Sequence, residues 1–462
     1  MGEGLDAQRT FSRRAVLGGA LAGAAAVGLT PGRRSANWAR AMARDATKGP
    51  GTLPNPKAPA GSDQLPEITT IVAVMMENHT YDNILGLQQG RGKGFTLDSK
   101  GNPTASNPGP KGETVHAFPM PTPCQLTGYP YNTWEAGDKS YAGGRMDGFV
   151  KSQSGPVSMG YFEPSVLPFT NSLATVFPVC DQYFSSVMAQ TYPNRRYFMA
   201  ATSLGQIADT INGQSPPNGT IFQVLNKYDI SWKNYYVEGP ASLLIWTYLS
   251  TIPSVTSNAV PIDQFFTDAA AGTLPAYSMV DPNFDVSSEE DPQDVQFGDD
   301  FLSQIVNAVM ESPQWPSTLL VWTYDEGGGY YDHVPPPAAI KPDSVPPDLS
   351  STDPSGVVFN RYGFRVPSGI ASPYARPNYV SSVVHDHTSI LKLIETKWNL
   401  PALTFRDAHA DDLLDSVDLT SKPAFLEPPT LAAPADVSVL EGCLTTGPGT
   451  IPPPGYVTGG HS

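Results

Sequence analysis

The sequence contains few charged residues and few cysteines for its length of 462 residues. Only 16% of the residues are charged, and 28 basic against 44 acidic side chains give a formal net charge of −16. Binding to a phosphate backbone requires Lys and Arg, so this deficit argues against nucleic acid as a partner. Glycine shows no regular period, which excludes collagen. The hydrophobic fraction of 40% is too high for a disordered chain, so we expect a globular protein.

The three cysteines, Cys124, Cys180 and Cys443, allow at most one intrachain disulfide. A Cys124–Cys180 bridge would fit an oxidising compartment, and three unpaired thiols fit the sequence equally well. The spacing of the cysteines does not match a zinc finger.

The longest uncharged stretch near the amino terminus, residues 15–30, is short for a membrane span, which needs roughly 20 residues. Arg13 and Arg14 precede it, and this order is typical of a twin-arginine export signal. We therefore predict that residues 1–43 direct the protein to an export machinery and across the bacterial cytoplasmic membrane, to the periplasm, the cell envelope or the medium. The alternatives are an uncleaved membrane anchor and a simple Ala-rich helix.

The sequence is rich in proline and glycine, with 47 and 42 residues, which indicates many ordered loops. Two stretches are especially rich in them, and we interpret residues 44–66 as a linker and residues 427–462 as a tail. Between them, residues 67–426 are predicted to form one large domain.

Continuous apolar runs within this domain predict strands that are buried on both faces. The two strongest runs are residues 68–76 and 318–324, and weaker strands are expected at 230–237 and 276–280. A helix capped by Asp299 or Asp300 is predicted to extend to about residue 310, and another to start near His387. Strands that alternate with helices predict an α/β layered fold with a mainly parallel sheet.

Polar clusters follow both strong strands. Glu77 and Asn78 follow the first, and Asp325 and Glu326 follow the second. Carboxylates directly after buried strands are costly unless they are paired or bind a metal ion. Oxygen ligands suit a hard divalent cation, although a single cluster of this kind is more often a turn or a helix cap.

The chain resembles the phosphoesterase family that includes bacterial phospholipases C, plant non-specific phospholipases C and certain acid phosphatases. Six ordered segments carry the resemblance and cover most of residues 67–418. They are ENHTYD at 77–82, GRMDGF at 144–149, TYPNR at 191–195, YDEGG at 324–328 with DHVPP at 332–336, GFRVP at 363–367, and DHTSI at 386–390 with Glu395 and RD at 406–407.

The resemblance implies an alkaline-phosphatase-like fold and makes residues 67–426 a phosphoesterase catalytic domain. It also implies that Thr191 is the nucleophile, which would form a phosphothreonine intermediate, where sequence alone would favour a helix cap. One divalent metal ion (Ca, Mg, Mn or Zn) is expected. Its ligands by the same resemblance are Glu77, Asn78, Thr191, Asp325 and Glu326.

Two histidines, His333 and His387, match family residues that bind phosphate or protonate the leaving group. We further predict that Asn78, Arg195 and Asp291 contact the substrate. A salt bridge is an equally suitable role for Arg195. Asp291 stands where many family members have a histidine, so this site would hold an additional carboxylate.

The sequence thus predicts an exported, metal-dependent phosphoric ester hydrolase that acts on a phospholipid or on a soluble phosphomonoester or diester. We find no basic amphipathic helix, so at most a peripheral membrane contact is expected. The alternative is a non-catalytic, exported ligand-binding protein with a decayed phosphoesterase site.

Overall fold

The computed structural model describes residues 48–439, except residues 89, 125–129, 212–213, 247–256, 352 and 355. The predicted export signal and most of the predicted tail, including Cys443, lie outside the described residues. From Gly49 onward the described residues belong to one compact unit.

An eight-stranded sheet forms the centre of this unit, with the strand order β12-β6-β11-β10-β1-β9-β7-β8. The pairs from β10 through β8 are parallel, whereas β11 runs antiparallel to both of its neighbours. The strands are β1 (Thr70–Met76), β6 (Val179–Cys180), β7 (Trp232–Tyr236), β8 (Ala259–Pro261), β9 (Tyr277–Val280), β10 (Thr318–Tyr324), β11 (Ser368–Ala371) and β12 (Val380–Ser381).

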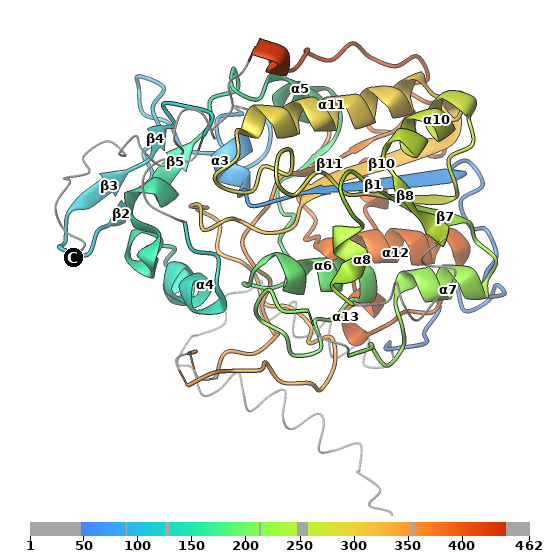
Figure 1. Cartoon of the computed structure of the whole chain (residues 1–462), viewed down its shortest axis with the longest axis horizontal. Helices are drawn as coiled ribbons and strands as arrows, with labels where there is room; N and C mark the ends of the chain where they lie inside the picture. Colours follow the sequence, from blue (N-terminus) through green and yellow to red (C-terminus); the bar gives the residue numbers. More distant parts are fainter. Residues whose placement is uncertain are drawn as a thin grey trace, which may run out of the picture. The chain divides into compact units, whose positions relative to one another are not determined.

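Helices cover both faces of the sheet, which confirms the predicted α/β layered architecture (Figure 1). On one face lie α5 (Pro168–Val176), α10 (Asp263–Ala271) and α11 (Val295–Glu311). The other face carries α6 (Thr191–Ala200), α7 (Ile221–Lys227), α8 (Ala241–Leu244), α12 (His387–Trp398) and α13 (Phe405–Ala408).

A smaller region precedes α5 and contains short elements. These are α3 (Tyr81–Leu85), β2 (Ser106–Pro108), β3 (Thr114–His116), β4 (Phe118–Pro119), α4 (Trp134–Tyr141) and β5 (Gly160–Tyr161). None of the helices in the described part of the chain has the length and apolarity that crossing a membrane requires.

The two strong apolar runs form the adjacent central strands β1 and β10, and every residue of both strands is buried. The two weaker strand predictions correspond to β7 and β9. Sequence analysis missed β6, β8, β11 and β12, which have only two to four residues each. In β11 the sequence is Ser-Gly-Ile-Ala, which lacks the β-branched and aromatic residues that indicate a strand.

The predicted start of α11 is wrong. Its N-cap is Asp294, whose side chain accepts a hydrogen bond from the backbone N–H of Gln296. Asp299 lies inside the helix and accepts hydrogen bonds from the backbone N–H groups of Phe169 and Thr170 in the first turn of α5. Asp299 thus accepts hydrogen bonds from the N-terminal N–H groups of a neighbouring helix, and in the sequence alone it resembles a cap of its own helix.

The Cys124–Cys180 bridge is also wrong, because Cys180 is a buried free thiol. Cys124 is disulfide-bonded. Cys180 ends the inner strand β6, and its burial raises the pKa of the thiol, so it is kept protonated and unreactive.

The described part of the 44–66 segment contacts the domain through Asn399, the residue that follows α12. The Asn399 amide donates to the carbonyl oxygens of Asn55, Ala58 and Pro59, and its Oδ1 accepts from the N–H of Asn55. This part of the segment is therefore held against the rest of the compact unit.

Candidate active site

The carboxyl ends of β1 and β10 bring the two polar clusters together. Met76 pairs with Tyr324 in parallel register, so Glu77 and Asp325 leave the sheet side by side. The backbone N–H of Asn78 donates to Asp325 Oδ1 at 3.3 Å. Ligands of open α/β sheets bind at this edge, which makes it the first candidate for a site.

Two buried oxygens at this edge have no hydrogen-bond partner among the residues that the structure describes: Glu77 Oε2 and Asn78 Oδ1. Asn78 also adopts a left-handed backbone conformation, with φ of 67°. An unsatisfied buried oxygen is costly, and strained backbone is often found at functional positions. A divalent cation accepts such oxygens as ligands, so the donor set fits a metal ion.

The pKa values of the carboxylates at this edge are raised. Burial raises the pKa of Glu77 and Glu326 well above the ordinary range, and the charge of Asp325 adds to it in both cases. Glu326 Oε1 accepts from the Asn132 amide at 2.6 Å, and Oε2 accepts from the N–H of Gly328 at 2.8 Å. Both oxygens of Glu326 are thus engaged, whereas Glu77 retains an unpartnered one.

Arg195 is the cation that the protein itself supplies to this edge. Its side chain is completely buried, and its Nε donates to Asp325 Oδ2 at 3.1 Å. Nη2 lies 3.7 Å from Glu77 Oε1, and Nη1 lies 3.5 Å from Asp281 Oδ1. These are the contacts of a salt bridge, which is one of the two roles that the sequence left open for Arg195.

Thr191 is the first residue of α6 and is buried. It precedes Arg195 by four residues and therefore shares its helix face, the face that meets Asp325 and Glu77. The next residue, Tyr192, donates its backbone N–H to Asp209 Oδ1 at 2.7 Å. The first turn of α6, which Thr191 begins, therefore lies on the helix face from which Arg195 reaches the carboxylates.

Sequence reasoning missed two carboxylates near this edge, Asp209 and Glu290. Desolvation raises the pKa of Asp209 to about 6, although the Tyr192 N–H lowers it, and the charge of Asp325 contributes to the rise. Burial and the charge of Asp325 raise the pKa of Glu290 to about 7. No sequence motif indicated Asp209, whereas Glu290 stands directly beside the predicted Asp291.

Asp291 itself has a different partner. The Tyr330 hydroxyl donates to Asp291 Oδ1 at 2.8 Å, and burial raises the pKa of Asp291 to about 8. The charge of Asp325 acts on the pKa of its neighbour Glu290.

His387 lies beneath the site and is fully buried. Its Nε2 is 2.6 Å from the backbone oxygen of Asp325, and its Nδ1 is 3.4 Å from the Tyr183 hydroxyl. Burial lowers the pKa of His387 to about 3. A neutral imidazole that donates from Nε2 to the Asp325 backbone oxygen helps to hold that residue in position.

His333 is partly exposed, and its Nδ1 is 2.7 Å from Asp82 Oδ2. Desolvation lowers the pKa of His333, but the hydrogen bond and charge of Asp82 outweigh it and raise the pKa overall. Ligand atoms of Asp82, Asp332 and His333 lie within 4.8 Å of one another, a spacing that a metal ion could use. Arg365 already donates to both carboxylates, so their charge is compensated without an ion.

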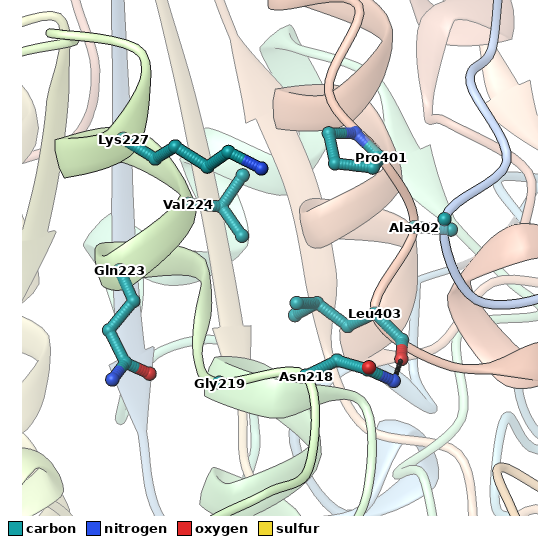
Figure 2. A pocket seen from close by; sticks show the side chains of 9 residues that line it. Asn218, Gly219, Gln223, Val224, Lys227, Pro401, Ala402 and Leu403 are labelled. Carbon is teal, nitrogen blue, oxygen red and sulfur yellow. Dashed lines mark hydrogen bonds between the residues drawn. The ribbon is translucent and has the colours of Figure 1, made fainter.

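A cavity lies elsewhere in the domain, away from the carboxylate edge. Its volume is about 430 Å³, and it lies between α7 and residues 401–403, with the Lys227 amine and Asn218 on its walls (Figure 2). Asn218 crosses its floor and donates to the carbonyl oxygen of Leu403. None of the predicted site residues lines it. A much smaller cavity of about 10 Å³ is lined by Asn132 and Glu326 and adjoins the carboxylate edge.

Comparison with known proteins agrees with the class of enzyme that this site suggests. Residues 68–401 match the model of the phosphoesterase family. Non-specific phospholipase C4 of Arabidopsis thaliana is 32% identical over 81% of this chain and 76% of the relative. Phospholipase C B of Mycobacterium tuberculosis is 29% identical over 78% of this chain and 79% of the relative.

The chain belongs to the phosphoesterase family and is a hydrolase of phosphoric ester bonds. Among solved structures, a member of the alkaline phosphatase superfamily from Vibrio parahaemolyticus aligns with 68% of this chain and 73% of its own, at a TM-score of 0.36 and 10% identity. A lipoteichoic acid synthase from Listeria monocytogenes aligns over 76% and 77%, at a TM-score of 0.37 and 10% identity.

Proposed function

We propose that this protein is an exported, metal-dependent phosphoric ester hydrolase that uses Thr191 as its nucleophile. The observation that carries the proposal is the pair of unpartnered buried oxygens, Glu77 Oε2 and Asn78 Oδ1, at the carboxyl end of β1. They lie beside Asp325 and next to the helix that Thr191 begins. Family membership supplies the reaction class.

The residues that would hold the metal ion are Glu77, Asn78, Thr191 and Asp325, with Glu326 beside them. When bound, the ion would lower the pKa of a coordinated hydroxyl and offset negative charge on the phosphoryl oxygens. An all-oxygen set suits calcium, magnesium and manganese, and zinc also binds carboxylates.

In the proposed reaction, Thr191 Oγ1 attacks phosphorus while the bond from phosphorus to the ester oxygen breaks. The alcohol leaves with a proton, and water then hydrolyses phosphothreonine to regenerate the hydroxyl. His333 is suited to the role of proton donor, because Asp82 orients the imidazole and raises the pKa of His333. Arg195 and His387 hold Asp325 in position for this chemistry.

The named relatives are phospholipases C, which supports a phosphodiester of a phospholipid as substrate. A soluble phosphomonoester is the second candidate. Release from a chromogenic phosphomonoester, a chromogenic phosphodiester and phosphatidylcholine distinguishes the two.

These assays are run with and without chelator for the wild type, Thr191→Ala and Thr267→Ala, an exposed threonine on α10 as the matched control. We expect a loss of at least about 10³-fold for Thr191→Ala and for chelated enzyme, because the nucleophile or its activation is removed. Full activity in Thr191→Ala would refute the mechanism. Inactivity of the wild type on every ester, with each cation added, would favour the non-catalytic binding protein.

Export is proposed from the sequence alone, since residues 1–43 lie outside the described part of the chain. Replacing Arg13 and Arg14 by Lys should retain the full-length precursor in the cytoplasm of a bacterial host, because twin-arginine signals are read through the arginine pair. Cell fractionation measures this outcome. Unchanged export of the double variant would contradict the twin-arginine assignment.

A further inference from the structure

Three adjacent strands of the central sheet, β10, β1 and β9, are each followed by an acidic residue at the carboxylate edge. Asp325 and Glu77 follow β10 and β1, and Asp281 follows β9. The first two are proposed metal ligands, whereas no motif in the sequence assigned a role to Asp281. The Asp281 side chain is completely buried. A buried carboxylate is costly unless neighbouring groups compensate it, so its contacts indicate what it does.

Donors from two other elements hold Asp281. The Ser242 hydroxyl on α8 donates to Asp281 Oδ1 at 2.6 Å, and the Asn234 amide on β7 donates to Oδ2 at 3.1 Å. The backbone N–H of Ser242 also donates to Oδ2, at 3.4 Å. Burial raises the pKa of Asp281, while Arg195 and these hydrogen bonds oppose the rise. A carboxyl group that is surrounded by donors is expected to be ionised.

Ser242 also connects Asp281 to Arg195. Its hydroxyl oxygen accepts a hydrogen bond from Arg195 Nη1 at 3.1 Å, while its proton is donated to Asp281. The same Nη1 atom lies 3.5 Å from Asp281 Oδ1. One end of the guanidinium is therefore fixed at the end of β9. We call Asp281 and Ser242 the arginine anchor.

Other nitrogens of the same guanidinium meet the proposed metal ligands. Nε donates to Asp325 Oδ2 at 3.1 Å, and Nη2 lies 3.7 Å from Glu77 Oε1. Arg195 thus contacts one oxygen of each carboxylate. The second oxygen of Glu77, Oε2, has no hydrogen-bond partner in the described part of the chain. The position of the guanidinium therefore decides which carboxylate oxygens remain for a cation.

The charge of Arg195 also makes it a competitor of the cation. A guanidinium and a divalent cation that share two carboxylates repel each other, and this repulsion is stronger in a buried site than in water. The Asp281 carboxylate, 3.5 Å from Nη1, offsets the positive charge of Arg195. Without Asp281, more of that charge would act against a cation held by Glu77 and Asp325.

We propose that Asp281 is a positioning residue which, through Ser242 and Arg195, sets the affinity of the carboxylate edge for its divalent cation. This inference rests on the metal dependence in the proposed function. It assigns to the arginine anchor two effects: the anchor fixes the guanidinium on one oxygen of each ligand carboxylate, and it offsets the charge of the guanidinium. Residues that orient metal ligands in this way commonly change metal affinity by about 10–100-fold.

The test measures cation affinity of the full chain, freed of metal with a chelator, by isothermal titration calorimetry with calcium, magnesium, manganese and zinc. Asp281→Asn should weaken binding of the preferred cation by about 10–100-fold. Asp268→Asn is the matched control, because Asp268 on α10 is also buried, accepts from the Tyr235 hydroxyl at 2.7 Å and pairs with Lys233. The control should keep the wild-type affinity.

A second variant, Ser242→Ala, keeps every charge and removes only the hydroxyl between Asp281 and Arg195. It should weaken cation binding by about 3–10-fold, as the loss of one hydrogen bond does. If circular dichroism shows that Asp281→Asn is unfolded, Ser242→Ala decides the test.

Three results would overturn the inference: wild-type affinity in a folded Asp281→Asn, wild-type affinity in Ser242→Ala, or an equal loss in Asp268→Asn. Wild-type protein that binds none of the four cations would instead overturn the metal dependence in the proposed function, and the inference with it. The wild-type titration therefore separates a failure of the proposed function from a failure of the arginine anchor.

Discussion

At the scale of single residues, Arg195 connects the carboxylates of the site to one another. Its guanidinium meets Glu77, Asp281 and Asp325, and it also donates to the carbonyl oxygens of Met75 and Met76 at the end of β1. One side chain therefore compensates buried charge from β1, β9 and β10.

Replacing Arg195 by Met should lower the free energy of unfolding by about 3–5 kcal/mol, because removing one partner leaves uncompensated buried carboxylates. Urea denaturation measures the change. The control is Arg145→Met, since Arg145 is 69% exposed and pairs only with Asp147, and it should cost less than about 1 kcal/mol. Equal losses in the two variants would contradict the role assigned to Arg195.

Gly328 permits the close approach of two loops at the site. Its φ is +61°, and a Cβ there would lie 1.9 Å from the backbone oxygen of Asn78. Gly356 has a similar φ of +82° but faces open space. Gly356→Ala should lower the free energy of unfolding by about 1–2 kcal/mol, because alanine disfavours the left-handed conformation, and it should retain activity. Gly328→Ala should cost more and abolish ester hydrolysis, and urea denaturation with an activity assay would show whether the two variants differ.

At the scale of elements, the start of α11 depends on a cap and not on the acidic pair inside the helix. Asp294→Ala should lower the free energy of unfolding by about 1 kcal/mol, because the N–H of Gln296 loses its acceptor. Asp300→Ala removes only a contact with Gln304 and should change stability by less than about 0.5 kcal/mol. Thermal unfolding of both variants decides between them, and a larger effect of Asp300→Ala would restore the sequence-based assignment.

The central elements were predictable because their sequence pattern is strong. Buried parallel strands such as β10 require continuous apolar runs, and 318–324 was predicted with the observed bounds. Short edge elements such as β12, with two residues, leave no pattern in a sequence. The cap of α11 was misassigned because a carboxylate that caps another helix looks the same in sequence as one that caps its own.

The parts of the site that follow β1 and β10 could also be predicted, because the carboxyl ends of adjacent parallel strands lie at the same edge of the sheet. Contacts between distant loops could not be predicted from the sequence. Asp209 carries no motif, and its place near the site follows only from its bond to Tyr192. His387 matches a family histidine, yet its burial and its bond to the Asp325 backbone depend on tertiary packing.

At the scale of the whole molecule, cation binding should stabilise the fold, because the unfolded chain has no preformed site. At 100 times the dissociation constant, binding adds about 2.7 kcal/mol. We therefore expect the melting temperature of chelated protein to rise by about 3 °C on addition of the preferred cation. Differential scanning calorimetry with calcium, magnesium, manganese and zinc measures the rise.

Two variants make this measurement specific to the site. Glu77→Gln should reduce or abolish the rise, because it replaces a carboxylate that has an unpartnered oxygen. Glu311→Gln, at the exposed end of α11, should leave it unchanged. A melting temperature that no cation shifts would argue against a metal ion at this position.

The Arg195–Asp325 contact spans 130 residues of sequence, and the Asn78–Asp325 contact spans 247. During synthesis, Glu77 and Arg195 leave the ribosome long before the carboxylate that completes their network. Closing loops of this length is slow, so the site is among the last features a newly made chain acquires. Under the proposed mechanism, ester hydrolysis therefore requires a chain that has completed this network and would report the completion of folding.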